Sequence, residues 1–237
     1  MKSIILLKEL EKYKVFNNKI VSDIIKKDHN YTRLLIYRLK KSNLIIEIEK
    51  NKYTVHEDPL IIADSMVWPS YLSCWTALRF HNLTEQLPNT IFVITTRARK
   101  NNKIVFKNNK IIFIKVKQKY FFGYNKENYR GYDTFIADPE KAIIDSALFK
   151  RISLSELYTI IKNNLNSINA ALFIDYLLRI KNKTLIKRFG TLFDKLRLDF
   201  YDKLKSFINN KYIILDYALP KNKNRNRKWK VIENVRY

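Results

Sequence analysis

Apolar residues recur every three or four positions in three short segments at the beginning of the chain. This spacing covers residues 4–13 and 19–27, and a polar pair at residues 17–18 separates the two segments. A third segment with the same period runs from residue 31 to Asn43, a residue type that tolerates the left-handed conformation at a helix end. Such a period is typical of helices with one buried face. The pattern therefore predicts three consecutive short helices.

Strand-type residues follow directly after the third helical segment. LIIEIE at 44–49 and KYTVH at 52–56 are rich in β-branched and aromatic residues, and a tight turn at residues 50–51 joins them. Three helices followed by a hairpin is the order of a winged helix-turn-helix. Two acids and a proline at 57–59 end the pattern, so we expect a DNA-binding domain of this kind at residues 1–58.

The remaining residues, 59–237, are expected to form a second domain. Two helical segments come first, and the second, SYLSCWTALRFHN, is apolar on most sides and therefore buried. Between residues 90 and 137 the period changes to two, and TIFVITT, KIVFK, KIIFIKVKQ, YFFGY and YDTFIA are predicted strands. Helical spacing returns from residue 138 to about residue 208, before two short strand candidates around a basic loop. We expect an α+β fold with helices around one mainly antiparallel sheet.

The net charge changes what this fold is expected to bind. The chain holds 46 Lys and Arg against 22 Asp and Glu, a formal net charge of +24. A field of this sign attracts polyanions and speeds their encounter, so nucleic acid is the leading partner. The chain is also crowded with Lys, Asn, Ile and Tyr and has only three Gly, as an AT-rich genome tends to produce. Part of the charge therefore carries no specific meaning.

The chain offers no sequence signal for a metal, a disulfide or a membrane. Its single cysteine, Cys74, excludes a disulfide framework and a cysteine cluster, and His29, His56 and His81 lack metal-ligand spacing. No basic-then-apolar signal begins the chain, and no apolar run approaches the roughly 20 residues of a membrane span. We expect a soluble cytoplasmic protein with no metal, no cofactor and no membrane partner.

The third helical segment has two chemically different faces. Projected at about 100° per residue from residue 30, its apolar residues and one threonine gather on one side. That side consists of Thr32, Leu35, Ile36 and Leu39. The opposite side carries Asn30, Arg33, Tyr37 and Lys41. We expect this polar face to enter the major groove of DNA as a recognition helix.

The side chains on that face suit different parts of DNA. Arg33 is a predicted base reader because arginine bonds twice to guanine, and Asn30 because asparagine bonds twice to adenine. Arg38, Lys40 and Lys41 suit the phosphate backbone. The predicted DNA-contacting set, with the hairpin tip as a wing, is Asn30, Tyr31, Arg33, Tyr37, Arg38, Lys40, Lys41, Lys50, Asn51, Lys52 and Tyr53. A merely solvated basic helix and an ordinary exposed hairpin are the alternatives.

Four sequence blocks of the second domain carry a family resemblance. They are the helical segment with Trp75, Ala77, Leu78 and His81, the turn at 83–88, FFGY at 121–124 and DPEK at 138–141. With these blocks the chain resembles, nearly end to end, the antitoxin family of type IV abortive-infection toxin–antitoxin systems, the AbiE type. Asn82 departs from the glycine usual after the histidine, but asparagine is the next best residue for a left-handed helix end.

The resemblance implies a winged helix followed by the family's own α/β domain, in a protein that represses its own operon. It also implies a functional partner, a toxin that looks like a nucleotidyltransferase. Related chains include lone regulators, so a stand-alone transcriptional regulator stays open. We expect binding to inverted repeats of double-stranded DNA upstream of the operon, with a homodimer placing one winged helix on each half-site.

The acids of the DPEK block have a structural explanation beside a catalytic one. Asp138 supplies an N-cap acceptor, Pro139 suits the first helical position, and the helix dipole favours an acid at Glu140. His81, next to Phe80 at a helix end, is expected to be packed or capping. The structural interpretation is favoured for both.

Neither catalysis nor RNA binding is the leading prediction. The chain lacks the Gly-Ser and paired acids of a nucleotidyltransferase, a glycine-rich phosphate loop and a nuclease triplet, so we do not expect an enzyme. Lys115, Lys117 and Lys119 on one predicted strand face, with the tail KNKNRNRKWK at 221–230, favour RNA binding as a third interpretation. The same lysines equally suit the wet side of a sheet or an extended DNA footprint.

Overall fold

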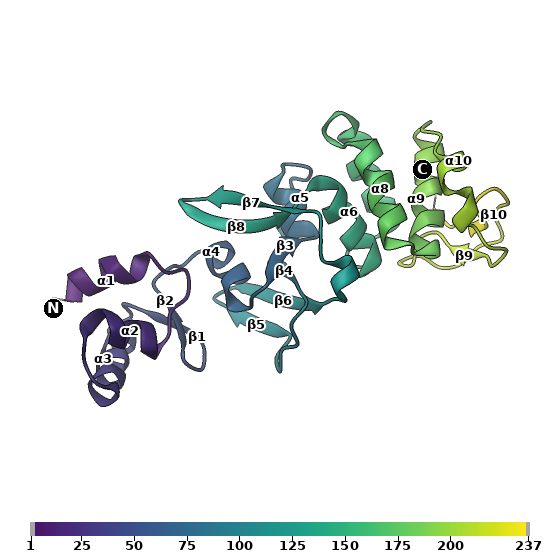
Figure 1. Ribbon diagram of the computed structural model, residues 1–237. Helices are drawn as coiled ribbons and strands as arrows, with labels where there is room; N and C mark the ends of the chain where they lie inside the picture. The colour runs from purple at the N-terminus through teal and green to yellow at the C-terminus, as the bar shows by residue number, and fades with distance from the viewer. Residues whose placement is uncertain (1–2, 236–237) are drawn as a thin grey trace. The chain divides into compact units, whose positions relative to one another are not determined.

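The computed structural model describes residues 3–235 and has an α+β fold (Figure 1). The chain divides into two compact units. Unit 1 consists of the residues up to 72 with 89–116 and 126–135, and unit 2 of residues 73–88, 117–125 and those from 136 onward. This division does not follow the boundary predicted at 57–59, because the N-terminal helices share unit 1 with most of the large sheet.

Unit 1 begins with three helices and a hairpin. These are α1 (Ser3–Glu11), α2 (Asn18–Ile25), α3 (His29–Lys41) and the antiparallel strands β1 (Ile46–Glu49) and β2 (Lys52–Thr54). Asn17 caps α2 by accepting a bond from the backbone N–H of Ile20 (3.0 Å), and Asp28 caps α3 through Tyr31 (2.9 Å). The predicted order of elements is therefore present, with slightly shifted ends.

One hydrophobic core holds these helices and the hairpin together. Its buried members are Leu6, Leu10, Phe16, Val21, Ile36, Leu39, Ile45 and Tyr53. Phe16 forms a β-bridge to Tyr53 through two backbone hydrogen bonds of 2.9 and 2.8 Å. Removing such side chains from water contributes about 25 cal/mol per Å² of apolar surface, which favours this packing over separate helices.

The large sheet has the strand order β5-β6-β4-β3-β8-β7. Its strands are β3 (Ser70–Ser73), β4 (Thr90–Thr95), β5 (Lys103–Phe106), β6 (Asn109–Lys115), β7 (Tyr124–Tyr129) and β8 (Tyr132–Ala137), and helix α4 (Pro59–Ala63) precedes them. β6 pairs antiparallel with β5 but parallel with β4. Because β5 already reverses the chain before β6, β6 runs in the same direction as β4. The predicted sheet therefore contains a parallel pair, β4 with β6.

Two segments have a different secondary structure from the one predicted. All four residues of β3 are buried in a strand, although SYLSC was predicted to be helical, and helix α5 (Trp75–Phe80) begins only after Cys74. A short run that is apolar on both faces fits a central strand as well as a buried helix. YFFGY was predicted to be a strand, but Phe121 and Phe122 lie outside the strands and β7 begins only at Tyr124.

The three lysines of the predicted basic strand do not share one strand face. β6 ends at Lys115, Lys117 follows outside the sheet, and Lys119 lies in a 3₁₀ turn at Gln118–Tyr120. The Lys119 ammonium lies 4.8 Å from the centre of the Tyr120 ring. The prediction of a continuous lysine-lined strand is therefore wrong, because the alternating pattern continues beyond the residue at which the backbone leaves the sheet.

Unit 2 is built mainly from helices. These are α5, α6 (Pro139–Leu148), α7 (Leu154–Asn163), α8 (Ala170–Ile180), α9 (Lys183–Lys195) and α10 (Tyr201–Leu204). The helical spacing that the sequence shows up to about residue 208 is interrupted after Lys195, and the backbone resumes helical geometry at α10. Within residues 3–235, no helix combines the length and the apolarity that crossing a membrane requires.

A small sheet with the order β10-β11-β9 lies at the C-terminal end of unit 2 (Figure 1). Its strands are β9 (Ile213–Ile214), β10 (Arg225–Asn226) and β11 (Val231–Ile232). Trp229, between β10 and β11, is fully buried and donates from Nε1 to Asp194 of α9 (2.7 Å). A Cβ atom on Gly190 would stand 2.2 Å from the indole ring. Glycine is therefore required where α9 passes this tryptophan.

Candidate nucleic-acid interface

The inner face of α3 holds the helix against the N-terminal core. Thr32, Ile36 and Leu39 are buried, and Leu35 packs partly against the same core. The Thr32 hydroxyl donates to the Asp28 carbonyl oxygen (2.8 Å), so even the polar member of this face has a partner. Burial along α3 thus follows the two-faced division that the projection of residues 30–43 gives.

The outer face of α3 is open to solvent. Its exposed residues are Asn30, Tyr31, Arg33, Tyr37, Arg38, Lys40 and Lys41. Tyr37 is 62% exposed, an unusual exposure for so large a ring and one that leaves both its edge and its hydroxyl accessible. Among residues 3–235, Arg33, Arg38 and Lys41 form no ion pair, so their charges are available to an external anion.

Lys40 differs from its neighbours because it already has an acidic partner. Its ammonium forms an ion pair with Glu47 of β1, and this hydrogen bond raises the pKa of Lys40 above its usual value. The charge of Lys40 is therefore largely balanced within the protein. Of the three predicted phosphate-binding residues on α3, Arg38 and Lys41 are the ones without an ion pair within residues 3–235.

Tyr53 does not lie at the exposed hairpin tip where the prediction places it. It is only 8% exposed, its ring centre lies 6.1 Å from that of Phe16, and burial raises the pKa of its hydroxyl. Successive side chains of a strand point to opposite faces, and Tyr53 falls on the inward face of β2. The assignment of Tyr53 to a DNA contact is corrected here, since the residue belongs to the core.

The other tip residues have unequal freedom. Asn51 has a φ of 60° and accepts a bond from the backbone N–H of Asn18 (3.0 Å), so it shapes the turn. Lys52 donates to the Met66 carbonyl oxygen (2.9 Å) and to Glu49 (3.3 Å). Lys50 is exposed and forms no ion pair within residues 3–235. Lys50 is therefore the tip residue best placed to meet a phosphate.

A basic loop of the large sheet borders the hairpin within unit 1. A cavity of about 770 Å³ lies between β1–β2 and the residues around β5, and its basic lining residues are Lys50, Lys52, Arg99, Lys100 and Lys103. Arg99 lines this cavity and donates to Glu49 (2.6 Å) and to the Met66 carbonyl oxygen (2.8 Å). Sequence reasoning missed this loop, although the acid-free run TTRARKNNK at 95–103 was a visible signal.

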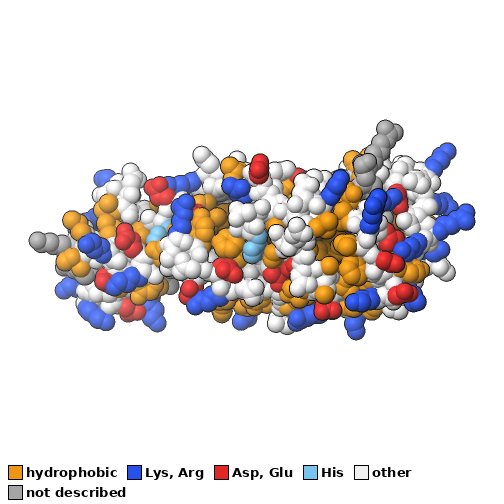
Figure 2. Space-filling model, turned by 90° about the horizontal axis from the view of Figure 1, so that it is seen from above, with side chains coloured by type: hydrophobic (Ala, Val, Ile, Leu, Met, Phe, Trp, Pro, Cys, Tyr) orange, Lys and Arg blue, Asp and Glu red, His pale blue; other side chains and the backbone are white. Residues whose placement is uncertain are grey.

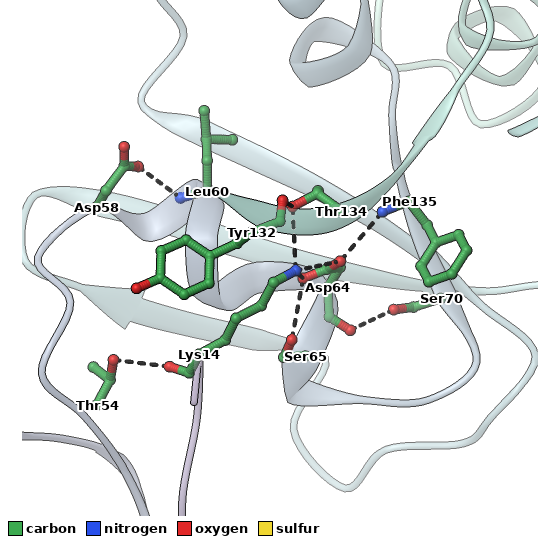
Figure 3. Close-up of polar contacts among 10 residues, drawn as sticks. All are labelled: Lys14, Thr54, Asp58, Leu60, Asp64, Ser65, Ser70, Tyr132, Thr134 and Phe135. Atoms are coloured by element: carbon green, nitrogen blue, oxygen red, sulfur yellow. Dashed lines mark hydrogen bonds and ion pairs between the residues drawn. The ribbon is translucent and has the colours of Figure 1, made fainter. Parts of the chain in front are cut away.

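A buried ion pair fixes the segment that joins α1 to α2 (Figure 3). The Lys14 ammonium bonds both carboxylate oxygens of Asp64, at 2.9 and 3.0 Å, and the Thr134 hydroxyl at 3.1 Å. The Phe135 N–H also donates to Asp64 (3.3 Å). Burial raises the pKa of Asp64, and Lys14 opposes that rise. This site is closed, because Asp64 is only 5% exposed, so it serves architecture within unit 1.

The DPEK block forms the helix start that the sequence suggests. One carboxylate oxygen of Asp138 caps α6 by accepting from the Lys141 N–H (2.8 Å), and the other accepts from the Tyr176 hydroxyl (2.7 Å). Glu140 accepts from the Asn169 N–H (2.5 Å). His81 is bonded through Nε2 to the Ala137 carbonyl oxygen (2.8 Å). All three side chains therefore have internal partners.

The other chemically distinctive groups of unit 2 are enclosed as well. Lys141 and Asp145 form a fully buried ion pair, and Ser73 donates to Asp145 (2.8 Å). Cys74 is buried, and burial raises the pKa of its thiol to about 12, which keeps it protonated and unreactive. No group of three potential metal ligands occurs among residues 3–235.

The comparison with solved structures finds a similar architecture in a mycobacterial protein. The chain is similar to the RV2827C protein from Mycobacterium tuberculosis, whose crystal structure superposes with a TM-score of 0.65 over 96% of this chain and 89% of that one. The two sequences are 9% identical, so the similarity concerns the fold alone. No family model matches the chain, and no curated protein matches it.

Proposed function

We propose that this protein is a DNA-binding transcriptional repressor whose α1, α2, α3 and β1–β2 hairpin act as a winged helix-turn-helix. The observation that carries the proposal is the outer face of α3. It presents Asn30, Arg33, Tyr37, Arg38 and Lys41 to solvent, with no ion pair among residues 3–235 for its two arginines. A recognition helix needs this combination of fixed inner face and free polar outer face.

Within this proposal the side chains divide between bases and backbone. Arg33 and Asn30 read base edges in the major groove, because their paired donors and acceptors match guanine and adenine. Arg38, Lys41 and Lys50 contact phosphates, and Tyr37 contacts an edge or a phosphate. The loop with Lys100 and Lys103 continues the basic surface next to the hairpin tip. The protein acts by binding, with no catalytic step.

We further propose, on the family resemblance of the TALRF, FFGY and DPEK blocks, that the repressor is the antitoxin of a type IV toxin–antitoxin system. It then binds inverted repeats upstream of its own operon as a homodimer and counters a nucleotidyltransferase-like toxin. A reading frame of that kind directly beside the gene supports this context. Its absence favours a stand-alone transcriptional regulator with the same DNA-binding face.

The test is a titration of the upstream DNA with the full chain and its Arg33→Ala variant. Loss of one bidentate base contact costs about 1–3 kcal/mol and relaxes the preference for the operator over a scrambled duplex. Lys162→Ala on α7, which is exposed and forms no ion pair among residues 3–235, is the matched control. Unchanged operator preference in Arg33→Ala contradicts the assignment of α3 as the recognition helix.

RNA binding is the second candidate, and the same titration addresses it. The lysine-lined strand that favoured RNA is absent, since Lys117 and Lys119 lie outside β6. A single-stranded RNA of matched length is therefore expected to compete more weakly than the operator duplex. Stronger competition by the RNA contradicts the proposed repressor.

A further inference from the structure

The C-terminal segment of unit 2 carries the densest positive charge that the α3 proposal does not use. Residues 209–230 contain seven Lys and Arg and one acid, Asp216, which is fully buried. Figure 2 shows several Lys and Arg side chains at the right-hand end of the view, where Figure 1 places the C-terminal part of the chain. Because the single acid is buried, this surface is left with an unbalanced positive charge.

Within residues 3–235, most of these cations form no ion pair. Lys228 pairs with Asp194 (2.9 Å) and lies 3.7 Å from Asp199. No ion pair within residues 3–235 involves the remaining cations of the segment, which are Lys211, Lys221, Lys223, Arg225, Arg227 and Lys230. Lys183, at the beginning of α9, is equally exposed and free of ion pairs in the same range.

The backbone that carries these cations is held in place by asparagines. In KNKNRNRKWK the cations alternate with Asn222, Asn224 and Asn226. Asn222 donates to the Glu233 carbonyl oxygen (2.6 Å), and Asn226 donates to the Glu233 carboxylate (2.7 Å) and accepts from the Trp229 N–H (2.9 Å). The fully buried indole of Trp229 then fixes the turn against α9. The cations thus project from an ordered scaffold.

A second anchor brings cations from three different elements together. The Lys187 ammonium of α9 donates to the carbonyl oxygens of Asn209 (2.9 Å) and Lys211 (2.5 Å). Burial lowers the pKa of Lys187, and the neighbouring charges of Lys183, Lys230 and Lys211 lower it further. Like charges held this close repel one another, so a bound polyanion relieves the repulsion.

The chemistry of this surface favours the phosphodiester backbone of a double helix as its ligand, rather than a protein or the unstacked bases of a single strand. Arg225 and Lys230 lie over the Tyr212 ring at 5.4 and 5.8 Å, and Lys228 covers Tyr201 at 4.9 Å. These rings are already covered by cations, so they are not free to stack on bases as single-strand platforms do. Protein interfaces are depleted of lysine, which argues against a protein partner.

We propose that Lys183, Lys211, Arg225, Arg227 and Lys230 form a second nucleic-acid-binding surface that contacts the phosphate backbone of a double helix without reading its sequence. Such contacts release condensed counterions, so each neutralised phosphate steepens the dependence of log K on log salt by about 0.9. The surface lies in unit 2. Its binding to a double helix does not depend on the proposed reading of bases by α3.

The experiment measures the affinity of the full chain for a random-sequence duplex between about 50 and 200 mM salt, the range in which phosphate contacts are most visible. We expect a triple variant to flatten the salt slope by about 2 to 3, because each lost phosphate contact removes about 0.9. This variant combines Arg225→Gln, Arg227→Gln and Lys230→Gln. Arg225→Lys with Arg227→Lys keeps the slope, because the charges remain. Lys162→Gln, Lys181→Gln and Lys203→Gln form the matched control.

Each outcome of this experiment supports or overturns the inference. An unchanged slope in the triple Gln variant with an intact thermal transition overturns it, and so does tighter binding of a single-stranded RNA of equal length. Salt slopes measured separately on duplex DNA and on duplex RNA show which of the two double helices this surface binds. The Arg33→Ala variant is expected to lose its preference for the operator but to keep the salt slope on the random-sequence duplex. Failure of the α3 proposal can therefore be distinguished from failure of this inference.

Discussion

The outer face of α3 and the C-terminal segment 209–230 are both strongly basic, but they are built in different ways. α3 presents its cations from a regular helix whose inner face is anchored by Ile36 and Leu39. The C-terminal cations project from turns that asparagine bonds, the buried Trp229 and the Lys187 ammonium hold in place. Composition does not distinguish the two regions, whereas the way each backbone is supported does. Specific base reading is therefore expected only from α3, since it needs a rigid regular element.

The largest expected effect is a loss of unfolding free energy when the packing of the C-terminal segment against α9 is disturbed. Trp229→Ala removes a fully buried indole and its bond to Asp194, which costs about 3–5 kcal/mol of unfolding free energy. Gly190→Ala, which forces a Cβ into the same ring, is expected to cost about 1–3 kcal/mol. Urea unfolding measures both. The control is Trp68→Ala, because Trp68 is 66% exposed. An equal loss of unfolding free energy in this control contradicts the structural role of Trp229.

A smaller loss of stability is expected from the buried ion pair of unit 1. Lys14→Met leaves Asp64 without its cation and costs about 3 kcal/mol at neutral pH. Burial already holds the pKa of Asp64 above its usual value, so its protonated form is the one that folding favours, and this loss shrinks as the pH falls. Thermal unfolding at several pH values tests this. A loss independent of pH contradicts the role of Asp64 ionisation, and adding Asp64→Asn is expected to restore part of the stability.

The N-cap of α3 offers a milder test of how this proposed recognition helix is supported. The bond from the Tyr31 N–H lowers the pKa of Asp28 below its usual value. A lowered folded pKa stabilises the protein above the unfolded pKa, and this contribution disappears as the pH falls through the folded one. Asp28→Ala is expected to lower Tm at pH 7, with a difference from the parent that narrows below about pH 4. A constant difference contradicts this account.

The smallest expected effect separates Arg38 from Lys40, two cations of α3. Arg38→Ala removes a free charge and is expected to flatten the salt slope of operator binding by about 0.9. Lys40→Ala removes a charge that Glu47 already balances, so its effect on the slope is expected to be smaller. Anisotropy titrations of the two variants side by side measure the difference. Equal slopes contradict the view that ion pairing within the protein decides which cations meet DNA.

Local patterns predicted the N-terminal elements well because their causes are local. The caps of α2 and α3 come from Asn17 and Asp28, each next to the helix it begins, and the two faces of α3 follow from its own period. The DPEK block likewise places its cap and proline within one turn. Strands were harder to predict, because β3 is buried on both faces and the polar β7 alternates only weakly.

The sequence by itself determined the positive charge, the order of the N-terminal elements and the polar face of α3. Tertiary structure alone decided that Tyr53 enters the core, that Lys40 is balanced by Glu47 and that the loop with Lys100 borders the hairpin. It also decided that β4 and β6 run parallel. Periodicity reports which side of one element is apolar, whereas pairing between distant segments depends on contacts that no single segment encodes.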